Sequence, residues 1–549
     1  MPVSLRRTTT LRKRIIPLLP ATLLCVSTHA AKPNVNAPKG GILVRNIQGE
    51  PTSLHPLLAN DLYAQFVHSY VLDSLVDRDL ETFEFKPRLA EKWETSDDGR
   101  LFTFHLRKDV KFHDGKPLTA EDVKFSLESV FDKNFGSVHW TPFFEGLDHV
   151  EIVDPLTVKV HLKNNYFLNF AAIGSFNIFP KHIYGDAQKS KRLTRELMGS
   201  GPYKLERFDR GIRIVLQRNE DWFGFKAPEW RGFGNFNTIV FRFVKDEKIA
   251  LELAKNGEID FDYPVRPEIV EDKDLAESLG KSLVANRVEN LLPKRYMFVG
   301  WNFQQQLFQD KNVRIALAHL MNREEINKKF RHGNSLLATG PTFIQSEYAP
   351  SSVKPIPYNP NKAKELLAKA GWSDPKKGIL EKDSDGKKIE FRFTLLHSNK
   401  DYEKYWTIFR EDLKKVGIEM NIKFVEWGAF LKLLDAGKFD AVALGWGGSF
   451  DWDPKPIWHS ASAVPGGSNF IHYRNTDVDK LIDQARFESD KRTRTGLLRN
   501  IYELIAADAP YIFMFNDKYE YYLNSSKIER PADTFAYDIG HEYWWTKQK

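Results

Sequence analysis

One segment of the chain combines residue types that can hold a ligand. Residues 444–454 read LGWGGSFDWDP, so an apolar stretch leads into three glycines, two tryptophans and two aspartates. Glycine lets a ligand approach the backbone closely, tryptophan supplies a rigid apolar wall, and aspartate can pair with a cation. The structural alternative is a tight turn whose tryptophans belong to the core. We favour the interpretation as a ligand site.

No motif for catalysis or for a bound metal accompanies this segment. The sequence lacks G-x-S-x-G, G-x-x-x-x-G-K-[ST] and H-E-x-x-H. The adjacent pairs His113-Asp114 and His541-Glu542 point to different faces of a strand or helix and do not have the spacing of metal ligands. We therefore predict no catalytic residue, no metal site and no cofactor. A secreted hydrolase, whose catalytic groups converge only in the fold, is kept as an alternative.

The elements around this segment predict how it is positioned. Residues 439–444 form an apolar strand, and the region from about 290 to 515 alternates helices with strands, the pattern of an α/β domain. Ligands in such domains commonly bind at the carboxyl ends of strands. Other elements expected here are strands at 296–302, 391–396 and 418–425 and helices at 312–319, 323–330, 361–370, 402–416 and 429–435.

The first half of the chain mixes both kinds of element. Apolar residues at helical spacing predict a helix over 63–75, and Thr119 is the expected N-cap of another. The strands expected in this half lie at 42–47 and 102–106, in a hairpin over 150–162, in a pair over 202–216 and at 239–244.

The first thirty residues have the layout of a secretory signal peptide. Five basic residues and no acid precede an apolar run over 15–26, and Thr28-His29-Ala30 supplies a small-x-small end. We predict export to the periplasm with cleavage near Ala30, which would also remove the only cysteine, Cys25. An uncleaved membrane anchor is the alternative.

Length, composition and charge exclude several classes of protein. A chain of 549 residues, 42% hydrophobic and with one cysteine, is too long for one domain and is neither disordered nor built on disulfides. The full chain has a formal charge of +7. Without residues 1–30 it has 75 basic and 73 acidic side chains, so its formal charge is +2. No dense basic stripe follows, so we predict no binding of nucleic acid.

Several motifs, taken in order, resemble one family. Residues 89–93 (LAEKW), 102–107 (FTFHLR) and 110–123 (VKFHDGKPLTAEDV) form its most diagnostic block. The further matches are at 199–203 (GSGPY), 218–222 (RNEDW), 359–372 and 439–447. Over residues 40–525 the chain is similar to the extracytoplasmic solute-binding proteins of ABC importers, family 5, the oligopeptide, dipeptide and nickel group. Residues 218–243 look most like the branch that takes up peptides and the peptide antibiotic microcin C.

The resemblance implies a fold. It is the α/β, two-lobed periplasmic-binding-protein fold of cluster C type, with a hinge and an extra small domain inserted in the first lobe. The implied boundaries are 31–75, 197–275 and 513–549 for a discontinuous lobe I, 76–196 for the additional domain and 276–512 for lobe II.

The resemblance also implies a function without chemistry. The protein would capture oligopeptides or peptide-like solutes between two closing lobes and deliver them, as a monomer, to an ABC permease and its ATPase in the inner membrane. The alternative solutes are an oligosaccharide, an opine-like compound or a metal chelate.

The site residues follow from the resemblance position by position. The Gly-Trp pair that binds peptide backbone in the family corresponds to Gly445-Trp446. The acid that pairs with the ligand's α-amine falls at Ser449, or slightly later at Asp451, so that Asp451 or Asp453 is the candidate anchor. The other implied ligand-binding residues are Asn60, Asp61, Tyr63, Trp140, Gly447 and Gly448. An N-cap role is the alternative for Asn60 and Asp61, and a core role for Trp140.

Overall fold

The computed structural model describes residues 32–548, apart from 60, 138–139, 272–278, 281, 374–377, 385 and 532–533. The predicted signal peptide, residues 1–30, and the candidate residue Asn60 lie outside the described residues. No helix in the described part of the chain combines the length and the hydrophobicity needed to cross a membrane.

The first lobe is built on a seven-stranded mixed sheet. At its centre β1 (Ile42–Ile47) runs parallel to β12 (Thr238–Phe243) along its full length. The apolar residues of these strands pack beneath α1 (Leu62–Val71), which buries Val67 and Tyr70 in the same cluster. In order across the sheet, the strands are β10 (Tyr203–Asp209), β11 (Arg213–Arg218), β12, β1, β13 (Phe261–Asp262), β23 (Glu520–Ser525) and β14 (Leu283–Val288).

The second lobe contains a six-stranded sheet that is covered on both faces. Successive residues of its strands enter two different hydrophobic clusters: Val299 lies in one and Phe298 in the other. Side chains of a strand alternate between faces, so this sheet separates two cores. In order, its strands are β16 (Ser335–Leu337), β22 (Tyr511–Asp517), β15 (Tyr296–Trp301), β21 (Ala441–Trp446), β19 (Arg392–His397) and β20 (Glu419–Phe424).

Long helices cover this second sheet. Those that supply one core are α9 (Lys311–His319), α10 (Arg323–Phe330), α11 (Pro360–Lys369) and α12 (Glu403–Lys414). The other core takes residues from α13 (Trp427–Asp435), α15 (Thr476–Arg486) and α16 (Lys491–Asp508).

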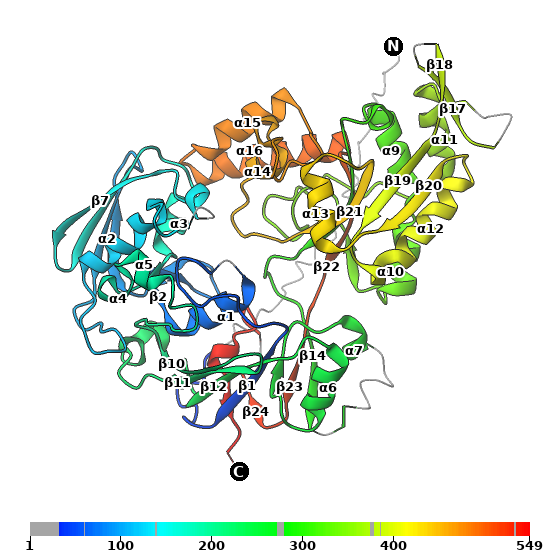
Figure 1. Ribbon diagram of the computed structural model, residues 1–549. Coiled ribbons are helices and arrows are strands. Elements are labelled where there is room, and N and C mark those ends of the chain that lie inside the picture. Colours follow the sequence, from blue (N-terminus) through cyan, green and yellow to red (C-terminus); the bar gives the residue numbers. More distant parts are fainter. Residues whose placement is uncertain are drawn as a thin grey trace, which may run out of the picture.

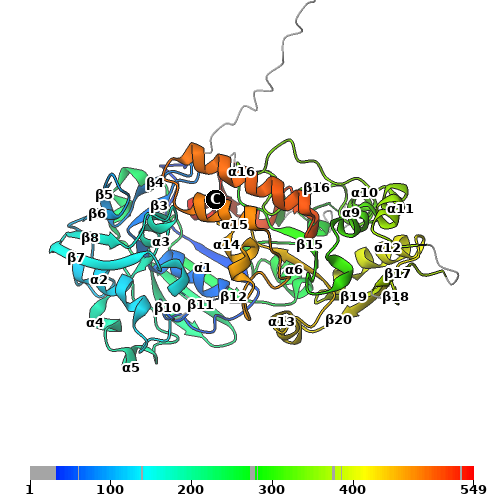
Figure 2. The same cartoon turned by 90° about the horizontal axis from the view of Figure 1, so that it is seen from above.

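A smaller unit is inserted in the first lobe. It is a four-stranded antiparallel sheet in the order β5 (Ala90–Thr95), β6 (Leu101–Leu106), β8 (Thr157–Leu162) and β7 (Leu147–Asp154). Helix α2 (Ala120–Glu128) packs on it and begins with a capping box at Thr119. Figure 1 shows this unit, in cyan, and the second lobe, in yellow and orange, on the two sides of the molecule above the seven-stranded sheet. Figure 2 shows the same two halves side by side from above.

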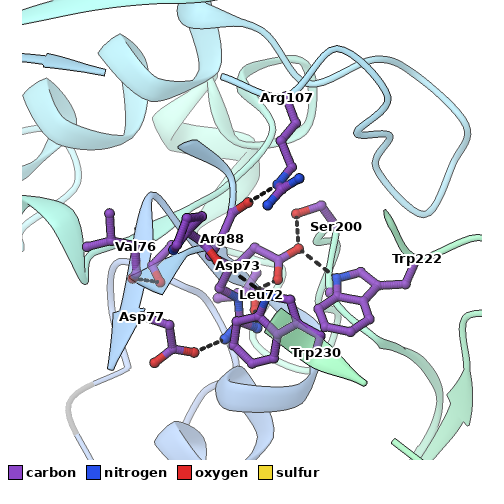
Figure 3. Close-up of polar contacts among 12 residues, drawn as sticks. Leu72, Asp73, Val76, Asp77, Arg88, Arg107, Ser200, Trp222 and Trp230 are labelled. Carbon is purple, nitrogen blue, oxygen red and sulfur yellow. Dashed lines mark hydrogen bonds and ion pairs between the residues drawn. The ribbon is translucent and has the colours of Figure 1, made fainter. Parts of the chain in front are cut away.

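A buried ion-pair network joins the inserted unit to the first lobe (Figure 3). Arg88 Nε lies 2.6 Å from Asp73 Oδ1, and Arg88 NH1 lies 2.6 Å from Asp77 Oδ2. The second oxygen of Asp73 accepts hydrogen bonds from Ser200 Oγ at 2.8 Å and from Trp222 Nε1 at 3.3 Å. This network explains why the helix predicted over 63–75 ends at Val71: Asp73 must leave the helical path to reach Arg88.

Two chain segments connect the lobes, and they differ from the predicted boundaries. Strand β14 belongs to the seven-stranded sheet, although the sequence predicts residues 276–512 in lobe II. Strand β22 belongs to the six-stranded sheet as far as Asp517, although the sequence predicts that the last segment of lobe I begins at 513. Strand pairing thus puts the crossings at 289–295 and 518–519. An ion pair of 2.6 Å joins Lys294 Nζ in the first crossing to Glu520 Oε1, in the first residue of β23 directly after the second crossing, and is largely buried.

Candidate functional site

The predicted segment borders a pocket in the second lobe. A cavity of about 340 Å³ opens where β19 and β21 end, as the general rule for α/β sheets leads one to expect. Three of the predicted residues line it, namely Gly445, Trp446 and Gly447. A cavity of this size matches the lower end of small-molecule sites. Its other lining residues are Arg295, Tyr296, Met297, Arg331, His397, Ser398, Asn399, Tyr402, Trp406, Ala443, Leu444, Phe515 and Asp517.

Strand β21 offers an open backbone edge at this pocket. It pairs with β15 along its whole length, from Ala441 to Trp446. On its other side it pairs with β19 only at Ala441 and Val442. Within the described chain no strand pairs with residues 443–446 on that side. The N–H and C=O groups of an open edge can receive an extended segment of another chain.

The ring of Trp446 packs against a core, while the backbone on either side of it is exposed. Its ring stacks on Phe298 with centroids 6.2 Å apart and contacts Phe470 at 5.9 Å, so it closes one edge of a core. Its Nε1 lies 3.4 Å from the Tyr511 hydroxyl. The flanking residues Gly445 and Gly447 are exposed, which leaves the backbone beside the ring open to a ligand.

The charged groups of the pocket are two arginines around one acid. Arg295 Nε lies 2.9 Å from Asp517 Oδ2, and Arg331 NH2 lies 2.5 Å from Asp517 Oδ1. Since one carboxylate faces two guanidinium groups, this wall carries an excess positive charge. A carboxylate or another anionic group of a solute would be favoured there.

Three buried polar atoms of described lining residues have no hydrogen-bond partner: His397 Nε2, Trp406 Nε1 and the Tyr296 hydroxyl oxygen. His397 is 2% exposed, and its Nδ1 lies 3.0 Å from the carbonyl oxygen of Asn399. Because a carbonyl only accepts, Nδ1 is the donor; Nε2 makes no hydrogen bond and lies 4.0 Å from Glu403 Oε2. Trp406 Nε1 is a buried donor, also without a partner. A polar solute in the pocket could satisfy such groups, whose burial otherwise costs free energy.

Asp451, a candidate anchor, is already paired. Its Oδ2 lies 2.9 Å from NH2 of Arg78, which comes from β3 (Val76–Arg78) at the start of the inserted unit. The neighbouring Phe450 contacts the Phe83 ring with centroids 3.6 Å apart. Ser449 is exposed, and its hydroxyl donates to the carbonyl oxygen of Asp451 at 2.9 Å. The loop after β21 therefore touches the inserted unit rather than presenting a free carboxylate.

Asp453, the other candidate anchor, also has partners. Its Oδ2 accepts a hydrogen bond from the Tyr166 hydroxyl at 2.6 Å and one from Arg486 Nε at 3.0 Å. Tyr166 belongs to the inserted unit and Arg486 ends α15, so this contact also bridges the cleft. Figure 1 shows α15 and α16 approaching the inserted unit at this point.

The remaining predicted residue of the loop, Gly448, serves packing. A Cβ atom at this position would lie 2.7 Å from the carbonyl oxygen of Lys294. Glycine is therefore needed for the loop to lie against the first connection between the lobes.

The candidates from the first lobe and the inserted unit take structural roles. Asp61 is the N-cap of α1: Oδ1 accepts from the Ala64 N–H at 2.8 Å, and Oδ2 accepts from the N–H and hydroxyl of Thr52. Tyr63 is half-buried against the core of the first lobe. Trp140 packs against the core of the inserted unit, with its ring 5.2 Å from that of Phe176. None of these three residues lines the pocket beside β21.

One cluster, which includes the adjacent pair His541-Glu542, comes close to a metal-ligand arrangement. Ligand atoms of Asp538, His541 and Glu542 lie within 4.8 Å of one another. However, His541 Nε2 lies 2.9 Å from NH1 of Arg45, which can only donate, so the neutral ring carries its proton on Nδ1. That nitrogen faces Glu542 Oε2 at 3.3 Å. A protonated Nδ1 and a neighbouring guanidinium group do not suit a metal cation.

Several residues of the site were not predicted. Arg78, Arg295, Arg331, Asp517 and His397 contribute its charged and polar groups. No spacing in the sequence marks them, because their partners lie far along the chain.

The fold and this site define a solute-binding protein with two lobes, and comparisons with known proteins agree. Residues 84–468 match the family described as bacterial extracellular solute-binding proteins, family 5 Middle. The chain belongs to this family. The matched range lies within residues 40–525, over which the motifs indicate the resemblance.

Individual relatives cover nearly the whole chain. The oligopeptide-binding protein AppA of Bacillus subtilis is 32% identical over 504 residues, which is 89% of each chain. The structure of AppA in complex with a nonapeptide covers 93% of this chain and 100% of its own, with a TM-score of 0.74. A probable peptide-binding protein, YejA of Agrobacterium fabrum, is 26% identical over 93% of this chain and 90% of its own. The structure of NikZ from Campylobacter jejuni with Ni(L-His) shares the fold, at a TM-score of 0.75 and 24% identity over 92% of this chain and 99% of its own.

Proposed function

We propose that this protein captures oligopeptides or peptide-like solutes in the periplasm and delivers them to an ABC permease. The observation that carries the proposal is the open edge of β21 at residues 443–446, beside a pocket with polar and charged walls. An extended peptide can add to such an edge through its backbone and place one side chain in the pocket. Backbone recognition fits solutes of varied sequence, and the oligopeptide-binding AppA is a relative at 32% identity.

The proposed cycle is binding, closure and delivery. A solute that contacts both lobes favours the closed arrangement, which is how occupancy can be signalled to a transporter. We propose that residues 1–30 direct export, that the protein acts as a monomer without catalysis, and that a permease and its ATPase are the partners. The proposed divisions are 31–75, 197–288 and 518–549 for lobe I, 76–196 for the inserted domain and 289–517 for lobe II.

The test begins with the full chain expressed in a bacterial host and purified from the periplasm. Sequencing of the N-terminus checks cleavage after Ala30. A thermal-shift panel of di- to decapeptides, oligosaccharides and nickel chelates then identifies the solute class. A ligand at about 100 times its dissociation constant adds about 2.7 kcal/mol to stability, which is readily measured. Stabilisation by the sugars or chelates alone would refute the peptide proposal and leave the solute-binding role.

A further inference from the structure

The carboxylate of Asp451 has a fixed partner on the other side of the cleft. Arg78 NH2 lies 2.9 Å from Asp451 Oδ2, and NH1 of the same guanidinium group donates to the carbonyl oxygen of Phe83 at 2.9 Å. The guanidinium carbon also lies 3.4 Å from the ring centroid of Phe85 and 4.4 Å from that of Phe83. Only 23% of the Arg78 side chain is exposed. These contacts hold Arg78 in place without a solute.

Aromatic packing brings Asp451 to this arginine. Phe450, one residue earlier, lies against Phe83 at 3.6 Å between centroids and contacts Tyr537 at 5.4 Å. Both partner rings belong to the side of the cleft that carries Arg78. The loop after β21 is therefore seated on the first lobe by an apolar contact and an ion pair at adjacent residues.

Two further acids near the β21 loop and pocket are also paired. Asp453 accepts from Tyr166 and Arg486. Asp517 lies between Arg295 and Arg331. Among the described residues, the carboxylates of Asp451, Asp453 and Asp517 are thus already paired, and at Asp451 the positively charged end of a solute would also be repelled by Arg78.

We infer that Arg78 masks Asp451, so that this protein does not select solutes by a free N-terminal ammonium group. Peptides with an acylated N-terminus are then bound about as well as peptides with a free one, and recognition depends on the backbone edge of β21 and on the pocket. This inference rests on the proposed function, because it specifies the class of peptide that the site accepts. A ligand amine could bind Asp451 and so link the lobes. In this protein Arg78 forms that ion pair with Asp451 instead.

The test compares one hexapeptide with a free and with an acetylated N-terminus by titration calorimetry of the full chain purified from the periplasm. For the wild type we expect the two affinities to agree within about threefold. In Arg78→Gln the exposed Asp451 should favour the free peptide by about tenfold or more, the range for a hydrogen bond between charged groups. Asp451→Asn should give a ratio near one. Arg78→Lys, which keeps the charge, is the matched control and should retain the wild-type ratio.

The outcomes separate this inference from the proposed function. A wild type that prefers the free peptide by more than about threefold would overturn the inference, whether Asp451→Asn abolishes that preference or leaves it in place. Binding of neither peptide, or of any other peptide in the panel, would overturn the proposed function and the inference with it. If Arg78→Gln does not fold, as judged by its melting temperature, the wild-type ratio decides whether a free ammonium group is selected, and Arg78→Met, which removes the charge but keeps an apolar side chain against Phe83 and Phe85, tests the masking.

Discussion

The cluster around Glu542 should make the protein less stable as the pH rises towards 8. Burial raises the pKa of Glu542 from 4.5 to about 8, and the neighbouring Asp538 acts in the same direction. Burial also raises the pKa of Asp538, and it lowers the pKa of His541 well below its ordinary value. The folded protein keeps the Glu542 carboxyl protonated at a pH where the unfolded chain has released that proton.

The sign and size of the effect follow from this difference. Between pH 4.5 and about 8 the folded state binds more protons than the unfolded chain, so the free energy of unfolding falls as the pH rises. A single group changes it by at most about 1.4 kcal/mol per pH unit. Because 22% of the Glu542 side chain is exposed to water, we expect a total on the order of 2 kcal/mol between pH 5 and pH 8.

The perturbation is Glu542→Gln, which removes the titration and keeps the shape. Urea unfolding at pH 5, 6, 7 and 8 should show a variant close to the wild type at pH 5 and more stable by about 2 kcal/mol at pH 8. Glu91→Gln, at an exposed position of β5, is the matched control and should give a constant difference. A constant difference for Glu542→Gln, or one that becomes less favourable as the pH rises, would refute the reasoning.

Three further predictions concern the ion-pair network between the inserted unit and the first lobe, and the pocket. Asp73→Ala leaves the buried Arg88 guanidinium group without its fully buried acidic partner and should lower the free energy of unfolding by about 3–5 kcal/mol, measured in urea. Trp446→Ala should weaken peptide binding by about tenfold or more while the protein still folds, as calorimetry and the melting temperature will show. Arg295→Gln should weaken the binding of peptides with an acidic group a few-fold at low salt and less at 0.5 M salt, because this arginine is exposed and screened.

Much of the fold follows from local patterns in the sequence. The strand predicted at 42–47 is β1 without change, and the hairpin predicted over 150–162 corresponds to β7 and β8. Thr119 begins α2 as expected. These elements are specified by side-chain periodicity and capping, which act within a few residues. The helix over 63–75 was predicted four residues too long, because its end is set by the contact of Asp73 with Arg88.

In the site, too, features set by local sequence could be predicted and features set by distant contacts could not. The glycines and the tryptophan at 445–447 could be identified from the sequence, because a strand that ends in small residues signals an open backbone whatever the rest of the chain does. Whether the two aspartates of the loop are free or paired could not be predicted from the sequence. Asp451 pairs with Arg78, which lies 373 residues away, and Asp453 pairs with Tyr166, which lies 287 residues away. No local pattern encodes such a distance, so a carboxylate that looks available in the sequence can be paired in the fold.

The two interpretations of residues 444–454 are therefore not exclusive. Trp452 is buried between Tyr348 and Tyr502, as the structural alternative predicts, whereas the backbone around Trp446 borders the pocket. Between them, Phe450 and Asp451 contact the opposite side of the cleft. A loop that is fixed at both ends and paired in its middle has few groups left for a solute other than its backbone. Discrimination among solutes must then come from the side chains that line the pocket, and substitutions there should change the choice of solute more than substitutions of the acids.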